Sequence, residues 1–143
     1  MDQNSCEQIK PMIWFDMNKQ LGGICKFKLD FLSKVIEETD IEMKEYGFFY
    51  GNISQDQSKH EIFKRQTGVL RTNCMDCTDR TNIVQTVFSR YLLLMILYNF
   101  GLVSHKPTGS AFEDLPENLE NIFCEIWEMH GNVLGNLYAG TGS

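Results

Sequence analysis

The residues of clearest chemical interest lie at positions 71–82, in the run Arg-Thr-Asn-Cys-Met-Asp-Cys-Thr-Asp-Arg-Thr-Asn. Cys74 and Arg80 are six positions apart, and Thr81 follows the arginine directly. A cysteine, five residues and an arginine on a strand-to-helix turn are typical of a phosphate-binding loop that carries its own nucleophile. Backbone N–H groups line such a loop, and the helix N-terminus adds positive potential. The spacing therefore predicts a phosphate-binding loop over residues 74–81.

Each side-chain type in this loop has a role in moving a phosphoryl group. A helix N-terminus and a neighbouring cation favour a thiolate, so Cys74 is expected to attack phosphorus and form a phosphocysteine intermediate. Arg80 presents a planar fork of donors that can hold two phosphoryl oxygens as their charge develops. Thr81 can donate its hydroxyl hydrogen to the thiolate when water cleaves the intermediate. The leaving alcohol needs a proton, and Asp76 is favoured over Asp79 as its acid.

The remaining residues of the run are expected to line the bound phosphate or the rim of its site: Arg71, Asn73, Met75, Cys77, Thr78 and Asp79. Arg71 has two interpretations, contact with a second phosphate of the substrate or an ion pair within the fold, and the ion pair is favoured. Thiolate, arginine and loop amides together balance the phosphate charge, so no metal or cofactor is expected.

The pair Cys74 and Cys77 has two alternative interpretations. Two residues between cysteines is a spacing of zinc ligands, but the chain has no second such pair and its three histidines are scattered. A redox pair at a helix N-terminus would need a facing turn proline, which the three prolines do not supply. Both interpretations are disfavoured, and a milder hypothesis stays open: Cys77 traps an oxidised Cys74 as a reversible disulfide.

Composition indicates one globular domain in a reducing compartment. The 143 residues are 43% hydrophobic and 12% aromatic, with five cysteines, an odd number, and a polar start without signal-peptide features. The net charge of −6 argues against a general nucleic-acid binder. Residues 59–90 nevertheless hold six Lys and Arg against three Asp and Glu, a local charge of +3 that suits an anionic substrate. The most apolar window, 83–100, contains Gln85, Ser89 and Arg90, so no membrane span is expected.

Apolar spacing, glycines and prolines predict an α/β chain. Strands are expected at 11–15, 48–50, 61–65 and 69–73, the last two as a hairpin through 66–68. Helices are expected at 28–45, 80–100 and 117–137, the last broken near Gly131 and Gly135, with loops at 17–26, 52–58 and 103–116. The phosphate-binding loop would then lie at the carboxyl end of a strand, where α/β sheets bind ligands.

The run at 71–82 resembles the signature of the Sac phosphoinositide phosphatase family, Arg-Thr-Asn-Cys-Met-Asp-Cys-Leu-Asp-Arg-Thr-Asn. Eleven of the twelve positions match, and Thr78 stands where the family has leucine. Three flanking segments are also similar to the family: Trp14-Phe15-Asp16-Met17, Tyr46-Gly47-Phe48-Phe49-Tyr50, and Trp127 with Tyr138-Ala139-Gly140-Thr141-Gly142. The resemblance thus covers about residues 13 to 142, nearly the whole chain.

This resemblance implies part of a cysteine-phosphatase-like catalytic domain with a strand–loop–helix core and an incomplete sheet. Family members carry a β-rich N-terminal region before this part, so residues 1–143 are expected to be a partial domain that a missing N-terminal region or a partner completes. The resemblance further implies hydrolysis of a monoester phosphate from an inositol headgroup. The expected partner is a phosphoinositide lipid, reached by a cytoplasmic protein that lies peripherally at the cytosolic face of membranes.

The chain also departs from the family pattern. The family has a histidine soon after Phe-Asp, where this chain has Asn18, Lys19 and a glycine pair at 22–23. Near the C-terminus the family typically has Asn-Gly-Asp, where this chain has His130-Gly131-Asn132. Two alternatives to a lipid phosphatase therefore stay open. One is a truncated, non-catalytic remnant, and the other is a protein-tyrosine phosphatase, since cysteine–arginine loops serve both classes.

Overall fold

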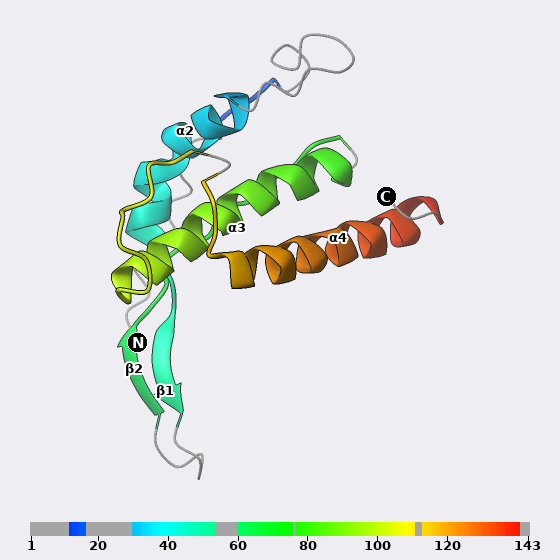
Figure 1. Cartoon of the computed structure of the whole chain (residues 1–143). Helices are drawn as coiled ribbons and strands as arrows, with labels where there is room; N and C mark the ends of the chain where they lie inside the picture. The colour runs from blue at the N-terminus through cyan, green and yellow to red at the C-terminus, as the bar shows by residue number, and fades with distance from the viewer. Residues whose placement is uncertain (1–11, 17–29, 54–59, 76, 111–112, 141–143) are drawn as a thin grey trace.

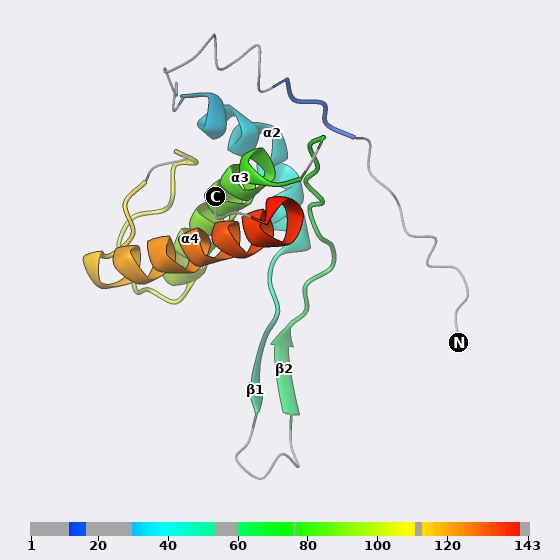
Figure 2. The same ribbon diagram turned by 90° about the vertical axis from the view of Figure 1, so that its right-hand side faces the viewer.

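A computed structural model of the chain describes residues 12–16, 30–53, 60–75, 77–110 and 113–140. Three helices and two strands form in these ranges (Figure 1): α2 (Asp30–Tyr46), β1 (Tyr50–Ile53), β2 (His60–Lys64), α3 (Asp79–Asn99) and α4 (Glu117–Ala139). Helix α3 lies between α2 and α4, and the β1–β2 hairpin projects away from the helices (Figures 1 and 2). None of the described helices is both long and apolar enough to pass through a bilayer.

Helix α2 confirms the predicted helix at 28–45. Its buried residues recur at helical spacing, and Leu32, Ile36 and Met43 are each no more than 3% exposed. Thr39 is buried on the same face, and its hydroxyl donates to the carbonyl four residues earlier at 2.8 Å. That hydrogen bond satisfies a polar group that burial would otherwise leave unpaired. The whole stripe can therefore pack against a neighbouring helix.

Helix α3 confirms the predicted helix at 80–100, starting and ending one residue earlier. It closes as a Schellman motif at Gly101, whose φ of 69° lies in the left-handed region that favours glycine. The Gly101 amide donates to the Tyr98 carbonyl at 2.9 Å, and the Leu102 amide donates to the Leu97 carbonyl at 2.8 Å. These bonds satisfy carbonyls that the helix end leaves unpaired.

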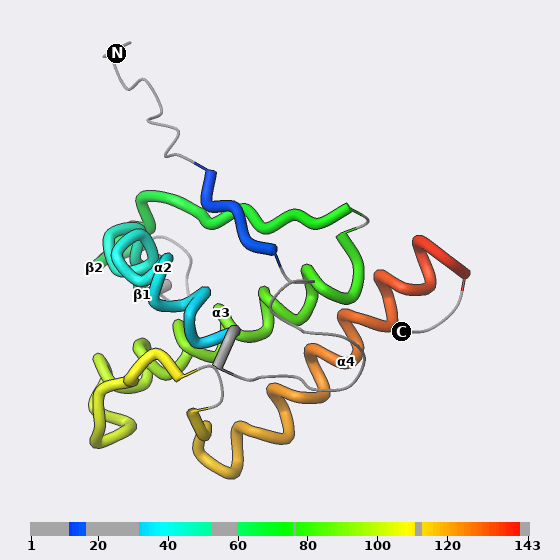
Figure 3. Tube along the Cα trace, turned by 90° about the horizontal axis from the view of Figure 1, so that it is seen from above, coloured from blue at the N-terminus to red at the C-terminus, as the bar shows by residue number. Residues whose placement is uncertain are grey.

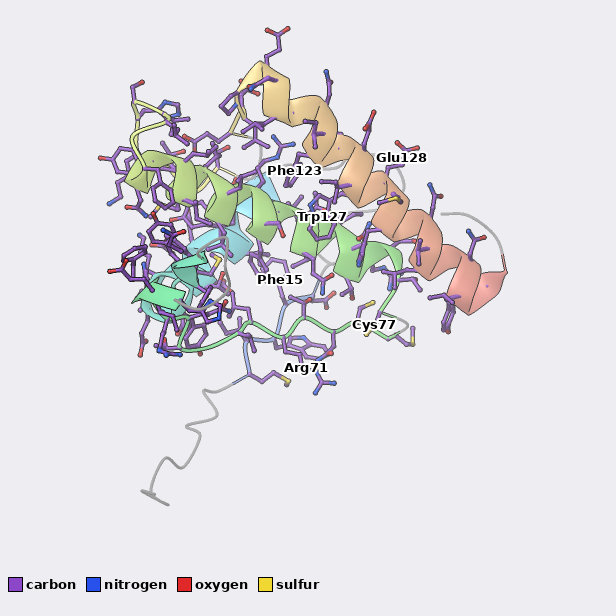
Figure 4. All side chains as sticks on the ribbon, turned by 90° about the horizontal axis from the view of Figure 1, so that it is seen from below. Phe15, Arg71, Cys77, Phe123, Trp127 and Glu128 are labelled. Atoms are coloured by element: carbon purple, nitrogen blue, oxygen red, sulfur yellow. The ribbon has the colours of Figure 1, made fainter. Side chains whose placement is uncertain are left out.

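Two hydrophobic clusters hold the three helices together. The first lies between α2 and α3 and contains Leu32, Val35, Ile36, Met43, Val87, Phe88 and Tyr91. The second lies between α3 and the start of α4 and contains Leu94, Leu97, Leu115 and Phe123. Trp127 packs against the second cluster, and Figure 4 shows it with Phe123 between the two helices. Because α3 contributes to both clusters, its position is fixed from two sides.

The predicted break of the last helix near Gly131 and Gly135 is wrong, because α4 continues without interruption to Ala139. A glycine inside a helix costs about 1 kcal/mol relative to alanine. Gly131 is buried, so packing at this point outweighs the local preference. Another face of α4 is apolar and largely exposed, at Ile122, Ile126, Met129, Val133 and Leu137.

The hairpin differs from the predicted one. The strand expected at 61–65 is confirmed as β2, but its antiparallel partner is β1 and not residues 69–73. β1 begins at Tyr50, so it takes only the last residue of the strand expected at 48–50. It also extends into the loop expected at 52–58. Residues 54–58 of that loop and the whole loop expected at 17–26 lie outside the described residues.

The strand predicted at 69–73 does not form, and residues 12–15 of the strand predicted at 11–15 do not form one either, since 12–16 and 65–73 have no regular structure. Residue 11 lies outside the described residues. A strand persists only where a neighbour completes its hydrogen-bond ladder. These two segments lie beside each other (Figures 2 and 3), but Phe15 and Leu70 pack against the first cluster instead of extending a sheet. The mixed helix-and-strand composition is confirmed. The strand half of the predicted strand–loop–helix core is absent from the described residues.

Arg90 and Glu120 join α3 to the start of α4. The guanidinium donates to both carboxylate oxygens, Nη1 to Oε2 at 2.6 Å and Nη2 to Oε1 at 2.5 Å. The Leu115 amide donates to the same carboxylate at 3.3 Å. Hydrogen bonds from Arg90 hold the pKa of Glu120 down to about 2. A bidentate pair of this kind fixes geometry as well as adding energy.

The Arg90–Glu120 pair predicts that the folded chain becomes less stable at acid pH. The folded pKa of Glu120 lies below its ordinary value of 4.5, so its contribution is complete above pH 4.5 and is lost as the pH falls toward 2. Glu120→Gln is expected to lower the free energy of unfolding at neutral pH by about 1–3 kcal/mol. Because 34% of the Glu120 side chain is exposed, solvent screening favours the lower end of that range.

Urea unfolding at neutral and at acid pH measures both effects. Glu117→Gln, an exposed substitution in the same turn, serves as the control and should change the free energy of unfolding by less than about 0.5 kcal/mol. If wild type and Glu120→Gln lose stability in parallel as the pH falls, the carboxylate does not carry the acid dependence.

Candidate functional site

The chain reaches the predicted loop across the C-terminal end of α2. The Thr67 amide donates to the Tyr46 carbonyl at 2.9 Å, and the Thr67 hydroxyl donates to the Glu45 carbonyl at 3.1 Å. Gly68 passes so close to Tyr46 that an added Cβ would lie 2.3 Å from a ring atom. These contacts fix the path of the segment after β2 and account for a glycine at this position.

Gln85 on α3 holds the segment just before the loop. Its side-chain amide donates to Thr72 Oγ1 at 3.0 Å, and both side chains are half-buried. Arg71 is exposed (Figure 4), and its Nε donates to Asn73 Oδ1 at 3.2 Å. Within the part of the chain that the structure describes, Arg71 contacts no acid, so the favoured ion pair is not found there. Its hydrogen-bond partner is instead Asn73, just before the loop.

The loop turns back on the sulfur of Cys74. The Cys77 amide donates to Cys74 Sγ at 3.1 Å, and Cys77 Sγ lies 3.3 Å from the Cys74 carbonyl oxygen. Cys77 has a φ of 56°, in the left-handed region that residues other than glycine rarely adopt. A residue in this conformation turns successive N–H groups toward one side of the chain, which makes a concavity suited to anions. The half-buried Cys74 sulfur therefore faces a backbone donor.

Arg80 and Thr81 lie in the first turn of α3, which starts at Asp79. Thr78 precedes the helix, and its side chain makes no capping hydrogen bond. Arg80 is exposed, whereas Thr81 is only 7% exposed, and its Oγ1 has no hydrogen-bond partner among the described residues. A buried hydroxyl without a partner costs about 1–3 kcal/mol. The hydroxyl lies in the first turn of α3, two residues after the helix begins.

The other predicted residues are distributed around this turn. Met75 is 93% exposed, and Asn73 and Asp79 are also exposed. Asp76, the predicted acid, lies outside the described residues. The structure thus places four of the predicted residues where the loop meets α3: Cys74, Cys77, Arg80 and Thr81.

Three residues for which the sequence predicted no role in the site connect it to α4. The Asn82 side-chain amide lies one residue after Thr81, and its Nδ2 donates to the Trp127 carbonyl at 3.5 Å. His130 Nδ1 lies 2.7 Å from Asn82 Oδ1, and its ring meets the Trp127 ring edge-on at 5.3 Å. The available signals were Asn82 as the last residue of the run at 71–82 and Trp127 in a flanking segment, but neither signal identifies a contact partner.

The two loop cysteines predict a reversible oxidation. Peroxide would convert the Cys74 thiol to a sulfenic acid and water, and the Cys77 thiol would then displace a second water to form the disulfide. Mild peroxide should therefore remove two hydrogens from the peptide that contains both residues, and a reductant should restore them. Cys77→Ser should take up oxygen on Cys74 stepwise instead. Stepwise oxygen addition in the wild-type chain would exclude the disulfide.

Known proteins resemble this chain in sequence. No protein-family model matches it, and no solved structure matches it. An uncharacterised protein of Schizosaccharomyces pombe is 34% identical over 91% of this chain and 20% of its own length. Human synaptojanin-1 is 33% identical over 92% of this chain and 7% of its own length. Phosphatidylinositol-3-phosphatase SAC1-A of Danio rerio is 30% identical over 92% of this chain and 20% of its own length.

These alignments cover about nine tenths of the chain, so they are not confined to the twelve residues of the signature. The chain itself spans no more than 20% of the length of these relatives. The chain therefore belongs to the Sac family, which includes synaptojanin and the phosphatidylinositol-3-phosphatase SAC1.

Proposed function

We infer that this chain carries the phosphate-binding loop of a phosphoinositide phosphatase, which removes a monoester phosphate from an inositol headgroup through a phosphocysteine at Cys74. One observation supports this most directly: the Cys77 amide donates to Cys74 Sγ at 3.1 Å, directly before the N-terminus of α3. An anionic nucleophile and its oxyanion substrate both require such donors. Family membership makes the phosphoinositide the first substrate class to test.

In the first step, the Cys74 thiolate attacks phosphorus, forming the S–P bond as the bond from phosphorus to the inositol oxygen breaks. The departing oxygen takes a proton from a carboxylic acid, a role for which the sequence favours Asp76. Arg80 holds two of the three remaining phosphoryl oxygens as negative charge develops on them. Arg80 lies in the first turn of α3, and the positive end of that helix would add to this stabilisation.

In the second step, the carboxylate left by the first step takes a proton from a water molecule as that water attacks the phosphocysteine, the S–P bond breaks, and inorganic phosphate leaves. Thr81 donates its hydroxyl hydrogen to the departing thiolate. This role suits a buried hydroxyl that has no other partner among the described residues. The enzyme returns to its starting state with the Cys74 thiolate and the protonated acid, so no metal or cofactor enters either step.

The remaining loop residues would bind the headgroup. Backbone N–H groups of Met75, Cys77, Thr78 and Asp79 would surround the phosphate, and the left-handed φ of Cys77 supports this, since such a residue turns successive amides toward one side. The exposed Arg71 and Asn73 side chains lie at the rim, where a second phosphate of the headgroup would be. The substrate lipid would be met peripherally, at the cytosolic face of a membrane.

A second candidate function is a remnant that binds without turnover, or that needs further polypeptide to act. The exposed apolar side chains on α4 favour it, since Ile126, Met129 and Leu137 are 52%, 62% and 80% exposed. The sheet favours it as well, because it has two strands among the described residues and both are edges there. Such surfaces are those that a larger domain or a partner would cover.

Phosphate release from a panel of short-chain phosphoinositides and a phosphotyrosine peptide tests the proposal. The chain is first shown to be folded by a cooperative urea transition. We expect release from at least one phosphoinositide and at most slow release from the peptide. Release from the peptide alone would contradict the lipid substrate, and no release from a folded chain would favour the second candidate.

A further inference from the structure

His130 contacts the first part of α3 from α4. Its Nδ1 lies 2.7 Å from Asn82 Oδ1, which is shorter than the 3.5 Å hydrogen bond from Asn82 Nδ2 to the Trp127 carbonyl. The helices run antiparallel here, because Arg90 meets Glu120 at one end and Asn82 meets His130 at the other. The loop end of α3 is therefore joined to α4 at a defined point.

The contact between the Asn82 side chain and the Trp127 carbonyl determines which nitrogen of His130 carries the hydrogen. The Trp127 carbonyl oxygen can only accept, so the Asn82 side-chain NH₂ group must face it, at 3.5 Å. Asn82 Oδ1 then faces the imidazole, and an oxygen of this kind also only accepts. His130 must therefore donate from Nδ1, and in its neutral form Nε2 carries the lone pair.

We propose that His130 is a positioning residue for the phosphate-binding loop. Its Nδ1–H holds Asn82, and Asn82 fixes the turn of α3 that carries Arg80 and Thr81. The inference rests on the function proposed above, because it assigns His130 to that site. Asn82 follows Thr81 directly, and its own amide donates to the Thr78 carbonyl at 2.9 Å, so a rotation of Asn82 would turn the preceding residues with it.

A second contact holds the chain on the other side of the loop. Gln85 holds Thr72 before the loop at 3.0 Å, while His130 acts after it through Asn82. The two contacts thus fix the two ends of the segment between them. A small displacement of a bound phosphate relative to its arginine is enough to slow a transfer reaction substantially.

Three substitutions of His130 separate the hydrogen bond from side-chain bulk. In His130→Asn, the amide nitrogen lies close to the position of the imidazole Nδ1, so the donor to Asn82 is kept; the family also has asparagine at this point. In His130→Gln, the amide nitrogen lies nearer the position of Nε2, so the donor is displaced. His130→Leu removes the donor and keeps most of the volume.

The measurements are the exchange rate of the Asn82 backbone amide by NMR, and kcat and KM for the preferred phosphoinositide. We expect His130→Gln and His130→Leu to raise the exchange rate about tenfold and lower kcat about tenfold, with KM changed by less than about twofold. His130→Asn should stay within about twofold of wild type in all three quantities. The thermal midpoints should be similar across the set, since the residue is exposed.

The outcomes separate this inference from the proposed activity. If His130→Asn and His130→Gln behave alike in amide exchange, the Nδ1 donor has no positioning role and the inference is overturned. If wild type releases no phosphate but the exchange rates follow the expected order, the link through Asn82 is supported and the proposed activity is contradicted. If the Asn82 amide exchange rates follow the expected order while kcat is the same in every variant, the His130–Asn82 contact only stabilises the structure. The inference is then overturned.

Discussion

Cys74→Ser is expected to lower phosphate release by at least about 1,000-fold. A serine hydroxyl stays protonated at neutral pH, so the substitution removes the nucleophile while changing the size of the side chain very little. The loop should keep its shape, because the donor that faces position 74 is the backbone amide of Cys77. The loss should therefore appear in kcat, and the affinity for orthovanadate, a phosphate analogue, should remain measurable.

Cys77→Ser is the matched control for this substitution. It removes a thiol from the same loop but keeps the backbone amide that donates to Cys74 Sγ. Phosphate release should stay within about fivefold of wild type. Equal losses in the two variants would mean that the loop tolerates no substitution, and an unchanged rate in Cys74→Ser would exclude a cysteine nucleophile.

Arg80→Lys is expected to lower kcat by about 100- to 1,000-fold while preserving the positive charge. Lysine offers one ammonium point charge in place of a planar fork, so it cannot hold two phosphoryl oxygens at once. The interaction strengthens as charge develops in the transition state, so the effect on kcat should exceed the effect on KM. Steady-state kinetics on the preferred phosphoinositide measure the effects on kcat and on KM separately.

Arg71→Lys provides the comparison for this second substitution. Arg71 lies at the rim of the loop and contacts Asn73, not the first turn of α3. Its replacement should change KM by less than about tenfold and leave kcat nearly unchanged. If Arg71→Lys lowers kcat as much as Arg80→Lys does, the two arginines have been assigned to the wrong places in the site.

Most of the helical structure could be predicted because its signals are local. The apolar spacing around Leu32 and Ile36 defined α2, and Gly101 marked the end of α3. The predicted break in α4 was wrong for the converse reason. Glycine lowers helix propensity wherever it stands, but the burial of Gly131 depends on the helix that packs against it. The sequence around Gly131 does not show which residues pack against it.

The strands were predicted less well, because a strand is completed by its partner. Residues 69–73 have a strand-like composition but remain irregular, and β2 pairs with the segment before it. The pattern of apolar residues could not choose between these two neighbours of β2. The same limitation applies to residues 12–15, which lie beside the loop segment without joining it in a sheet.

The chemistry of the site could be predicted from the sequence, but the contacts that hold the site in place could not. The positions of Cys74, Arg80 and Thr81 relative to the helix start follow from spacing alone. The Gln85–Thr72 and His130–Asn82 contacts link residues 13 and 48 positions apart. Such contacts depend on how the segment before the loop and α4 pack against α3, which no motif in the sequence encodes.

The central claim is that Cys74 becomes phosphorylated, and trapping the intermediate tests it most directly. The chain is mixed with its preferred phosphoinositide, quenched in acid, digested and analysed by mass spectrometry. Thr81→Ala is used alongside wild type, because losing the hydroxyl should slow cleavage of the intermediate and increase its amount. We predict a phosphoryl group on the Cys74 sulfur, more abundant in Thr81→Ala and absent from Cys74→Ser. Phosphate release with no phosphoryl group on Cys74, or with one on another residue, would contradict the account.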